Sequence, residues 1–354
     1  MNRRDIYYWK CDRPAAFHGT QARAGGEDPI ARLLEEELRQ TFGTQNVVLS
    51  PGVGQGNHLT WNAEIDGTPA FLRVENGPEQ DDHLAVESLV LDQVRAAGVD
   101  TPRVLGCDAT RRRVPFAWQA LERIPHPDLN RWFQQGVLDT ERIPFEIGVA
   151  VAKWQEIRPE GFGVLHAGLR GLRATYADYF QLRLEEHLGF LVNREFLSPA
   201  ERDEISREID RHGSLLELAQ GCLVHKDLAL WNILGTPQEI AAFIDFDDAV
   251  SGDPMDDLSL LACFHDARFV MRAMAGYQTV RPLPAEHRRR FWLHLLRNML
   301  VKSVIRVGAG YFERDSGFFL IGSGRSGTDL KRFTYARLHS ALTGLREDQG
   351  LDDL

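Results

Sequence analysis

The sequence predicts an α+β protein of two lobes, with a small antiparallel-sheet N-lobe and a larger, mainly helical C-lobe. Its 354 residues are too many for one small core and sufficient for two lobes. Strand patterns separated by turn residues gather between 47 and 122, whereas helical periodicity prevails after Pro127. We therefore expect an N-terminal extension over 1–27, the N-lobe over 28–123 and the C-lobe over 124–354.

The composition is that of a soluble globular protein and disfavours several classes of function. Hydrophobic residues make up 43% of the chain and charged residues 26%. A net charge of −10 argues against nucleic acid as a partner and mildly favours a cationic substrate. Four cysteines without C-x-x-C spacing indicate reduced thiols. Since no apolar run resembles a signal peptide or a membrane helix, we expect a cytoplasmic protein with no membrane partner.

The extension over 1–27 holds more aromatic residues than a disordered tail would carry. Tyr7, Tyr8, Trp9 and Phe17 all lie in it. We expect it to be ordered and to pack on the body of the protein. Whether it also shapes the active site stays open from the sequence. A helix should follow, because Asp28-Pro29 is a typical helix start and apolar residues then recur at helical spacing.

A glycine-rich loop is predicted between the first two strands, 47–49 and 58–65. It carries Gly52, Gly54 and Gly56, followed by Asn57. A Rossmann fingerprint needs a strand followed by a helix, which is not the setting here. A loop between two strands is the setting in which kinases bring bare backbone close to phosphates. Hairpins also use glycine, so a purely structural role stays open.

The stretch 222–258 contains the residues on which the functional prediction depends. Apolar runs at 222–224, 233–234 and 240–244 predict short strands, with a turn at 235–238. The hairpin should place Asn232 beside Asp245, with Asp227 in the loop before it. Such oxygen donors suit Mg²⁺, and an Asp outside the metal shell could accept a proton from an attacking hydroxyl.

The motif H-x-D-x-x-x-x-N, followed by I-D-F-D and G-D-P-x-x-D-L, resembles the aminoglycoside phosphotransferase and choline kinase-like family. These proteins are small-molecule kinases with a protein-kinase-like fold. The residues that carry the resemblance lie in order along the stretch: His225, Asp227, Asn232, Asp245, Asp247, Gly252, Asp253, Pro254, Asp257 and Leu258.

The resemblance implies ATP and Mg²⁺ as cofactors and a small molecule with a hydroxyl group as the acceptor. Asp227 would be the catalytic residue, and Asn232 and Asp245 would hold the metal, with Asp247 either ligating a second ion or forming a salt bridge. The implied nucleotide-binding residues are Gly54, Gly56, Asn57, Arg73, Glu87, Glu122 and Ile124. Among them, Glu87 would pair with Arg73, and Glu122 and Ile124 would lie at the link between the lobes, where backbone groups hold adenine.

Two positions depart from the pattern of the family. Arg73 stands where Lys is usual, so its geometry toward phosphate is uncertain from the sequence. Lys226 stands where Gly is common, and it could contact the γ-phosphate, an anionic substrate or solvent. Asp257 and His225 are expected to brace the catalytic loop rather than to act on the substrate.

The rest of the C-lobe is predicted to be helical, over 143–157, 172–196, 198–218, 255–264, 286–307 and 330–345. The acceptor is left open among an aminoglycoside or other antibiotic, a sugar or amino sugar, and a choline-like alcohol. The alternative is a catalytically inactive kinase-like scaffold that binds nucleotide or protein, for which Arg73 is the only support. A eukaryotic-type protein kinase is disfavoured, because the short segment 246–251 leaves no room for a long activation loop.

Overall fold

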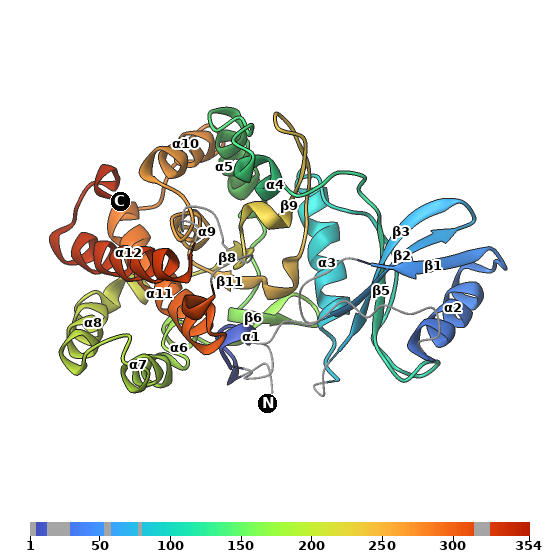
Figure 1. The fold of residues 1–354 in the computed structure, drawn as a ribbon, viewed down its shortest axis with the longest axis horizontal. Helices are drawn as coiled ribbons and strands as arrows, with labels where there is room; N and C mark the ends of the chain where they lie inside the picture. The colour runs from blue at the N-terminus through green and yellow to red at the C-terminus, as the bar shows by residue number, and fades with distance from the viewer. Residues whose placement is uncertain (1–4, 13–28, 53–57, 77–79, 315–325) are drawn as a thin grey trace.

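The N-lobe and C-lobe lie side by side in a computed structural model that describes residues 5–12, 29–52, 58–76, 80–314 and 326–354 (Figure 1). The N-lobe is built on one antiparallel sheet, and the C-lobe is mostly helical, which confirms the predicted fold class. Helix α3 (His83–Ala96) stands between the sheet and the C-lobe. It is buried on several faces and contributes Val86, Val90 and Val94 to the larger core.

The N-lobe sheet has the strand order β1-β2-β3-β5-β4. Its strands are β1 (Val47–Pro51), β2 (His58–Ile65), β3 (Thr68–Glu75), β4 (Val104–Asp108) and β5 (Trp118–Glu122). A hairpin turn at Asp66-Gly67 joins β2 to β3, and both residues have positive φ, as the commonest tight hairpin turn requires. Helix α2 (Pro29–Phe42) packs its apolar face, including Leu34 and Leu38, into the N-lobe core.

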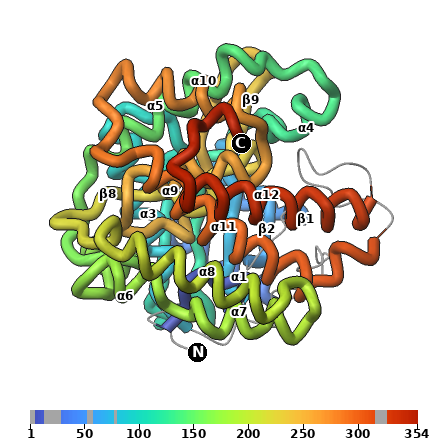
Figure 2. The backbone as a smooth tube through the Cα atoms, turned by 90° about the vertical axis from the view of Figure 1, so that its left-hand side faces the viewer, coloured from blue at the N-terminus to red at the C-terminus, as the bar shows by residue number. Residues whose placement is uncertain are grey.

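The C-lobe is organised around one long buried helix, α11 (His287–Gly308). Apolar and polar side chains are buried on all of its faces, which is the pattern of a central helix rather than a surface helix. It lies alongside α12, with α7 and α8 nearby (Figure 2). The other helices of the lobe are α4 (Leu129–Gln134), α5 (Arg142–Trp154), α6 (Tyr176–Phe180), α7 (Leu184–Asn193), α8 (Pro199–Arg211), α9 (Asp256–Leu261), α10 (Ala267–Gln278) and α12 (Gly327–Glu347).

The predicted helix over 172–196 is wrong. The segment instead holds the end of a strand and two shorter helices, α6 and α7. Thr175 caps α6 by accepting a hydrogen bond from the Asp178 N–H, and Arg183 separates the two helices with a φ of 61°. The helix predicted over 198–218 starts with a capping box formed by Ser198 and Glu201, but it ends at Arg211 and a 3₁₀ turn, η3 (Gly213–Leu216), follows.

A four-stranded sheet in the C-lobe was not predicted. Its strands run in the order β7-β6-β11-β8: β6 (Phe162–His166), β7 (Arg170–Arg173), β8 (Cys222–Val224) and β11 (Val250–Gly252). The hairpin of β9 (Ile233–Gly235) and β10 (Ile240–Phe243) is present as predicted. However, β8 pairs with β11 rather than with that hairpin. Two short 3₁₀ turns flank these strands, η4 (Leu230–Asn232) and η5 (Phe246–Asp248), and two more, η6 (Tyr311–Glu313) and η7 (Leu351–Asp353), follow α11 and α12.

The N-terminal segment Asp5–Asp12, which ends in α1 (Trp9–Asp12), is built into the C-lobe. The Tyr7 ring stacks on Tyr179 with 4.9 Å between centroids, and the Arg297 guanidinium lies 3.7 Å from the same ring. Asp12 closes the turn by accepting the backbone N–H of Tyr7 at 2.8 Å. This confirms the expected ordering of the extension for the Asp5–Asp12 segment, while the rest of it, including Phe17, lies outside the described residues.

All four cysteines are free, as their spacing predicted. Within the described ranges, none of the helices combines the length and the apolar character needed to cross a membrane.

Candidate active site

Asp257 of α9 holds the catalytic loop, between β8 and η4, by hydrogen bonds to its backbone. The Asp257 carboxylate accepts the backbone N–H of His225 at 3.0 Å and that of Lys226 at 3.1 Å, and it also accepts the Trp154 indole N–H at 3.1 Å. These contacts fix the loop backbone just before Asp227. The bracing role expected for Asp257 therefore matches its contacts.

His225 connects the catalytic loop to the end of β10. Its Nε2 lies 3.0 Å from the carbonyl oxygen of Ile244, and its Nδ1 accepts the Asp227 backbone N–H at 3.3 Å. Both ring nitrogens are thus engaged by backbone groups. Since His225 has no ring nitrogen left for a substrate proton, its contacts fit a bracing residue rather than a base, as expected.

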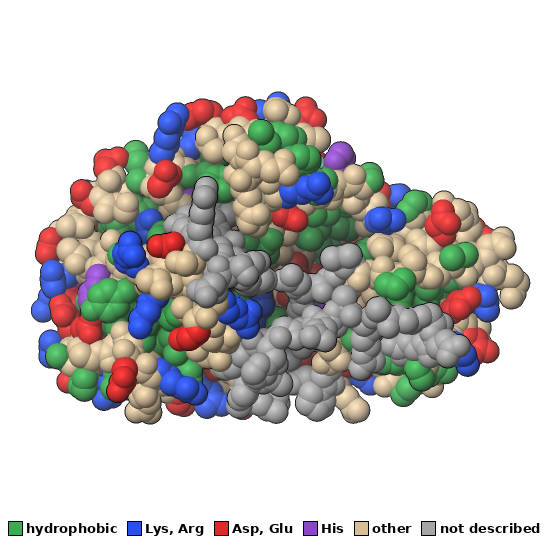
Figure 3. Space-filling model, in the orientation of Figure 1, with side chains coloured by type: hydrophobic (Ala, Val, Ile, Leu, Met, Phe, Trp, Pro, Cys, Tyr) green, Lys and Arg blue, Asp and Glu red, His purple; other side chains and the backbone are tan. Residues whose placement is uncertain are grey.

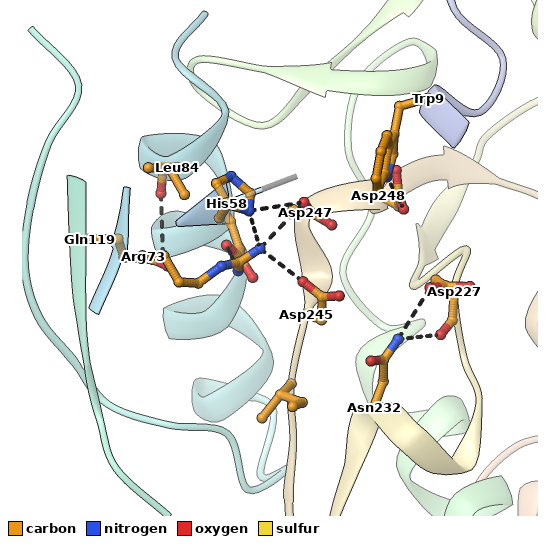
Figure 4. A network of polar contacts seen from close by, with 12 residues as sticks. Trp9, His58, Arg73, Leu84, Gln119, Asp227, Asn232, Asp245, Asp247 and Asp248 are labelled. Carbon is orange, nitrogen blue, oxygen red and sulfur yellow. Dashed lines mark hydrogen bonds and ion pairs between the residues drawn. The ribbon is translucent and has the colours of Figure 1, made fainter. Parts of the chain in front are cut away.

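Asn232 and Asp227 lie side by side in the loop (Figure 4). The Asn232 amide Nδ2 donates to the Asp227 carbonyl oxygen at 2.8 Å and to Asp227 Oδ2 at 3.3 Å. This orientation leaves the Asn232 amide oxygen on the side of Asp245. The Ile244 N–H donates to the Asn232 carbonyl at 3.0 Å, which brings the two halves of the motif together as the sequence predicted.

Asp245 occupies the junction between the lobes. It has a left-handed backbone, with φ 67° and ψ 53°, and its side chain is about one-third exposed. Its Oδ1 accepts a hydrogen bond from Arg73 Nη2 at 2.9 Å. Figure 3 shows a recess at this junction, bordered by hydrophobic side chains. Asp245 is therefore positioned to face a ligand that enters between the lobes.

Arg73 is the centre of a buried cluster on the N-lobe side, which we call the Arg73 cluster (Arg73, Glu87, Asp245, Asp247 and His58). Its guanidinium forms the predicted ion pair with Glu87 of α3. It also contacts Asp245, Asp247 at 3.3 Å and the His58 Nδ1 at 2.8 Å. Burial, together with the neighbouring charges of Asp245 and Asp248, raises the pKa of Asp247 well above its usual range. The Arg73 guanidinium is thus the shared cationic partner of three carboxylates.

The remaining nucleotide-binding predictions fall on the strands of the N-lobe and on the link between lobes. Glu122 ends β5, where its carboxylate accepts from Arg103 Nε at 3.1 Å, and Ile124 follows in the link. Their role toward adenine stays a prediction. Gly54, Gly56 and Asn57 lie outside the described residues. Gly52 is described, and a Cβ there would come within 2.8 Å of the Thr60 backbone, so close strand approach explains this glycine.

Lys226 points into the C-lobe and not toward the nucleotide. It is buried, and its Nζ donates to Asp256 Oδ2 at 2.7 Å, to the Tyr7 hydroxyl at 3.0 Å and to Asn298 Oδ1 at 3.2 Å. None of the three possibilities left open by the sequence describes it. Lys226 instead ties the catalytic loop to the N-terminal segment, through Tyr7.

Two lysines that the sequence analysis missed flank Asp227. Lys10 Nζ lies 3.4 Å from Oδ2, and Lys302 Nζ of α11 lies 3.2 Å from Oδ1. Burial alone would raise the pKa of Asp227, but the charges of Lys10 and Lys302 outweigh it and hold that pKa far below its usual range. With Asn232, these residues form what we call the Asp227 cluster. Beside it, the Trp9 indole donates to Asp248 Oδ2 at 3.0 Å (Figure 4).

Comparison with solved structures finds the same fold in kinases of small molecules. The crystal structure of aminoglycoside phosphotransferase APH(4)-Ia gives a TM-score of 0.60 at 16% identity, covering 90% of this chain and 100% of that one. APH(2")-IIa, in a ternary complex with streptomycin and ATP, gives 0.58 at 13% identity, with coverages of 91% and 99%. A putative fructosamine-3-kinase from Haemophilus somnus 129PT gives 0.56 at 14% identity, with coverages of 86% and 96%.

The search of curated protein sequences returns no match. A family model described as the phosphotransferase enzyme family matches residues 50–292, which include the catalytic loop, Asp245 and Arg73. Since this match spans most of the chain, the chain belongs to the phosphotransferase enzyme family and is a small-molecule phosphotransferase.

Proposed function

We propose that this protein transfers the γ-phosphoryl group of ATP, with Mg²⁺, to a hydroxyl group of a small molecule. The observation that carries the proposal is the placement of Asp245 between the two clusters, bonded to Arg73 on one side and facing Asn232 and Asp227 on the other (Figure 4). A kinase needs this order, from nucleotide cation to metal ligands to catalytic carboxylate. ATP as donor is supported by APH(4)-Ia and APH(2")-IIa, which are solved with AMP-PNP and ATP respectively.

The oxygen donors at the junction fit a magnesium ion. The Asn232 amide oxygen and the Asp245 carboxylate are hard donors on the same side of the loop. No group of three or more His, Cys, Asp or Glu side chains within the described ranges is arranged to hold a metal ion. Mg²⁺ suits such a site, because it is commonly bound by one or two carboxylates together with waters and substrate phosphates. When bound, it would neutralise charge on the phosphates.

Asp247, in contrast, is committed to Arg73 in this structure. Of the two roles that the sequence left open for it, a second metal ligand or a salt bridge, we propose the salt bridge. Arg73 would then be oriented by Glu87 and Asp247 toward the α- and β-phosphates of ATP. The extra donors of a guanidinium allow this cation to hold several carboxylates and still present an N–H to phosphate.

Asp227 would accept the hydrogen bond of the acceptor hydroxyl and align its oxygen for attack. The acceptor oxygen forms a bond to the γ-phosphorus while the bond from that phosphorus to the β,γ-bridging oxygen breaks. The electron pair of the broken bond stays on ADP, and the hydroxyl proton passes to Asp227. Catalysis of this type is mostly positioning and charge stabilisation.

The acceptor would be a hydroxyl-rich small molecule. Similar structures hold hygromycin B and streptomycin, and another is that of a putative fructosamine-3-kinase, which supports the aminoglycoside and sugar classes. The inactive-scaffold alternative is not favoured, because Arg73, its only support, forms the ion pair with Glu87 that an active kinase requires.

The proposal is tested by measuring Mg²⁺-dependent ADP release from ATP over a panel of aminoglycosides, amino sugars, sugars and amino alcohols. Asp227→Asn and Asp245→Asn should each remove acceptor-dependent release while the protein stays folded by circular dichroism. Asp352→Asn, an exposed change in η7, is the matched control and should behave as wild type. Full activity of either active-site variant would contradict the proposed roles of Asp227 and Asp245.

A further inference from the structure

Lysine is scarce in this chain, and most of its lysines surround the catalytic loop. The sequence holds 41 basic residues, of which 36 are arginine. The five lysines are Lys10, Lys153, Lys226, Lys302 and Lys331. Lys226 belongs to the catalytic loop, and Lys10 and Lys302 both contact Asp227 in that loop. An ammonium is a compact point charge on a flexible stem, unlike the planar guanidinium that this chain uses elsewhere. Lysine is thus concentrated in and around the catalytic loop.

Lys10 is carried to Asp227 by a segment that is fixed in the fold. Its neighbours Tyr7, Tyr8 and Trp9 are all buried, and Asp12 is bonded to His187 at 3.1 Å. If the N-terminal segment were an inhibitory plug that left the site on activation, these three rings would become exposed to water. The loss of their burial would make such a release costly. Lys10 is therefore a permanent component of the site and not part of a removable inhibitor.

The Lys10 side chain differs from its buried neighbours because it is partly exposed beside Asp227. It is 31% exposed, and its Nζ lies 5.3 Å from the Trp9 ring. Burial lowers its pKa, but the carboxylates of Asp227, Asp248, Asp245 and Asp247 more than reverse that effect and raise it. The ammonium thus stays charged between Asp227, the proposed catalytic residue, and Asp245, the proposed metal ligand.

Lys302 makes the complementary contact and is held in place. Its side chain is 8% exposed, and its Nζ lies between the rings of Tyr8, at 5.1 Å, and Phe264, at 5.3 Å. Because Lys302 remains on Oδ1 of Asp227, that carboxylate keeps a cationic partner when Lys10 is displaced from Oδ2. Of the two lysines, Lys10 is the one free to change partner.

We propose that Lys10 is a catalytic residue, whose ammonium binds an oxygen of the phosphoryl group in transfer. This inference rests on the proposed function. An acceptor hydroxyl bonded to Asp227 Oδ2 takes the position that Lys10 Nζ holds at 3.4 Å. The displaced ammonium then meets the phosphoryl oxygens that arrive between Asp227 and Asp245. Lysine and arginine placed on a transferring phosphoryl group stabilise its transition state. Lys10 stays protonated throughout, and the hydroxyl proton goes to Asp227.

Lys10 and Lys302 both lie outside residues 50–292, the part of the chain that matches the family model. Family membership therefore assigns them no role. With this role for Lys10, the N-terminal segment would contribute to catalysis as well as to packing.

The test compares nucleotide affinity with and without a mimic of the phosphoryl group, so no acceptor is needed. Wild type, Lys10→Met, Lys10→Arg and the exposed control Lys331→Met are titrated by calorimetry with Mg·ADP alone and with Mg·ADP plus aluminium fluoride. Lys10→Met should bind Mg·ADP within about twofold of wild type and bind the fluoride complex at least about tenfold more weakly. Lys10→Arg should recover part of this loss, and Lys331→Met should show none.

Each other outcome has a distinct meaning. Equal affinity of wild type and Lys10→Met for the fluoride complex would overturn the catalytic role. Tighter binding by Lys10→Met would overturn it as well, because Lys10 would then obstruct the site. If wild type binds neither complex, the proposed function itself fails, and the inference fails with it. Once an acceptor is known, Lys10→Met should lower kcat while leaving the KM for ATP nearly unchanged.

Discussion

The two clusters on either side of Asp245 have opposite charge balances. In the Arg73 cluster, one buried cation is shared among Glu87, Asp245 and Asp247. In the Asp227 cluster, one buried carboxylate is flanked by two lysines. Under the proposed function, excess negative charge would suit a side that receives a metal ion, and excess positive charge would suit a side that receives a phosphoryl group. The two clusters thus differ most in the ratio of their charges.

The largest expected effect comes from neutralising the single carboxylate of the Asp227 cluster. Asp227→Asn keeps the size of the side chain and removes the charge on which the acceptor hydroxyl depends. Acceptor-dependent kcat should fall by about 10²- to 10⁴-fold, the range for loss of a general base. Steady-state kinetics measures the loss, and Mg·ADP affinity by calorimetry serves as the control because the Arg73 cluster is untouched. A fall of less than about tenfold would show that Asp227 is not the base.

A second large effect, on the free energy of unfolding, is expected when Lys226, which anchors the catalytic loop next to Asp227, is replaced. Lys226→Met leaves Asp256 buried without its cation and breaks the contact to the Tyr7 hydroxyl. Removing one partner of a buried ion pair costs about 3–5 kcal/mol, so the midpoint of urea unfolding should fall clearly. The double variant Lys226→Met/Asp256→Asn should recover part of the stability. An unchanged midpoint for Lys226→Met would mean that the buried ion pair contributes nothing.

A smaller effect is expected from replacing the shared cation of the Arg73 cluster with the residue usual in the family. In Arg73→Lys, a point charge cannot reach Glu87, Asp245 and the His58 ring nitrogen together. Mg·ATP affinity, measured by calorimetry, should fall by about tenfold, while the state of Asp227 is unchanged. Wild-type affinity in this variant would show that the guanidinium geometry is dispensable for nucleotide binding.

The smallest effect concerns pH. Because the folded-state pKa of Asp227 is lowered, its ionised form contributes stability above its unfolded value of 3.8, and that contribution is lost as pH falls through the folded value. Protonation of Asp227 should therefore change kcat by less than about twofold between about pH 5 and 8. Lys302→Met removes one charge that opposes burial, so any acidic limb of the kcat profile should move to higher pH. A limb that stays in place would contradict the charge effect.

The sequence predicted the parts of the site that depend on local spacing. Asp227, Asn232 and Asp245 lie within 19 consecutive positions, and one hairpin brings them together. The Arg73–Glu87 pair was also predictable, because a strand and the next helix carry it. The residues that were missed approach from far along the chain: Lys10 is 217 positions from Asp227, and Lys302 is 75. No periodicity records such a contact, although the scarcity of lysine was a signal that could have drawn attention to them.

The fold shows the same division between local and long-range information. The hairpins and capped helices occur where the sequence carries turn and cap residues, as at Ser198 and Asp66-Gly67. The sheet of β6, β7, β8 and β11 was missed because its strands are only three to five residues long and β11 pairs with strands far from it in the sequence, β6 and β8. Helix α11 was predicted by its apolar positions. The roles of its buried polar residues were not predictable, because only the fold brings their partners near.

The backbone of Lys226 has a consequence for the ancestry of the protein. Its φ of 69° is left-handed, a conformation that costs a residue with a side chain about 1–2 kcal/mol and costs glycine almost nothing. The contacts of its ammonium with Asp256, the Tyr7 hydroxyl and Asn298 offset this cost. The aromatic N-terminal segment and this lysine should therefore be inherited together. We expect relatives that lack the segment to carry glycine at this position, and relatives that carry lysine to keep a tyrosine near the N-terminus.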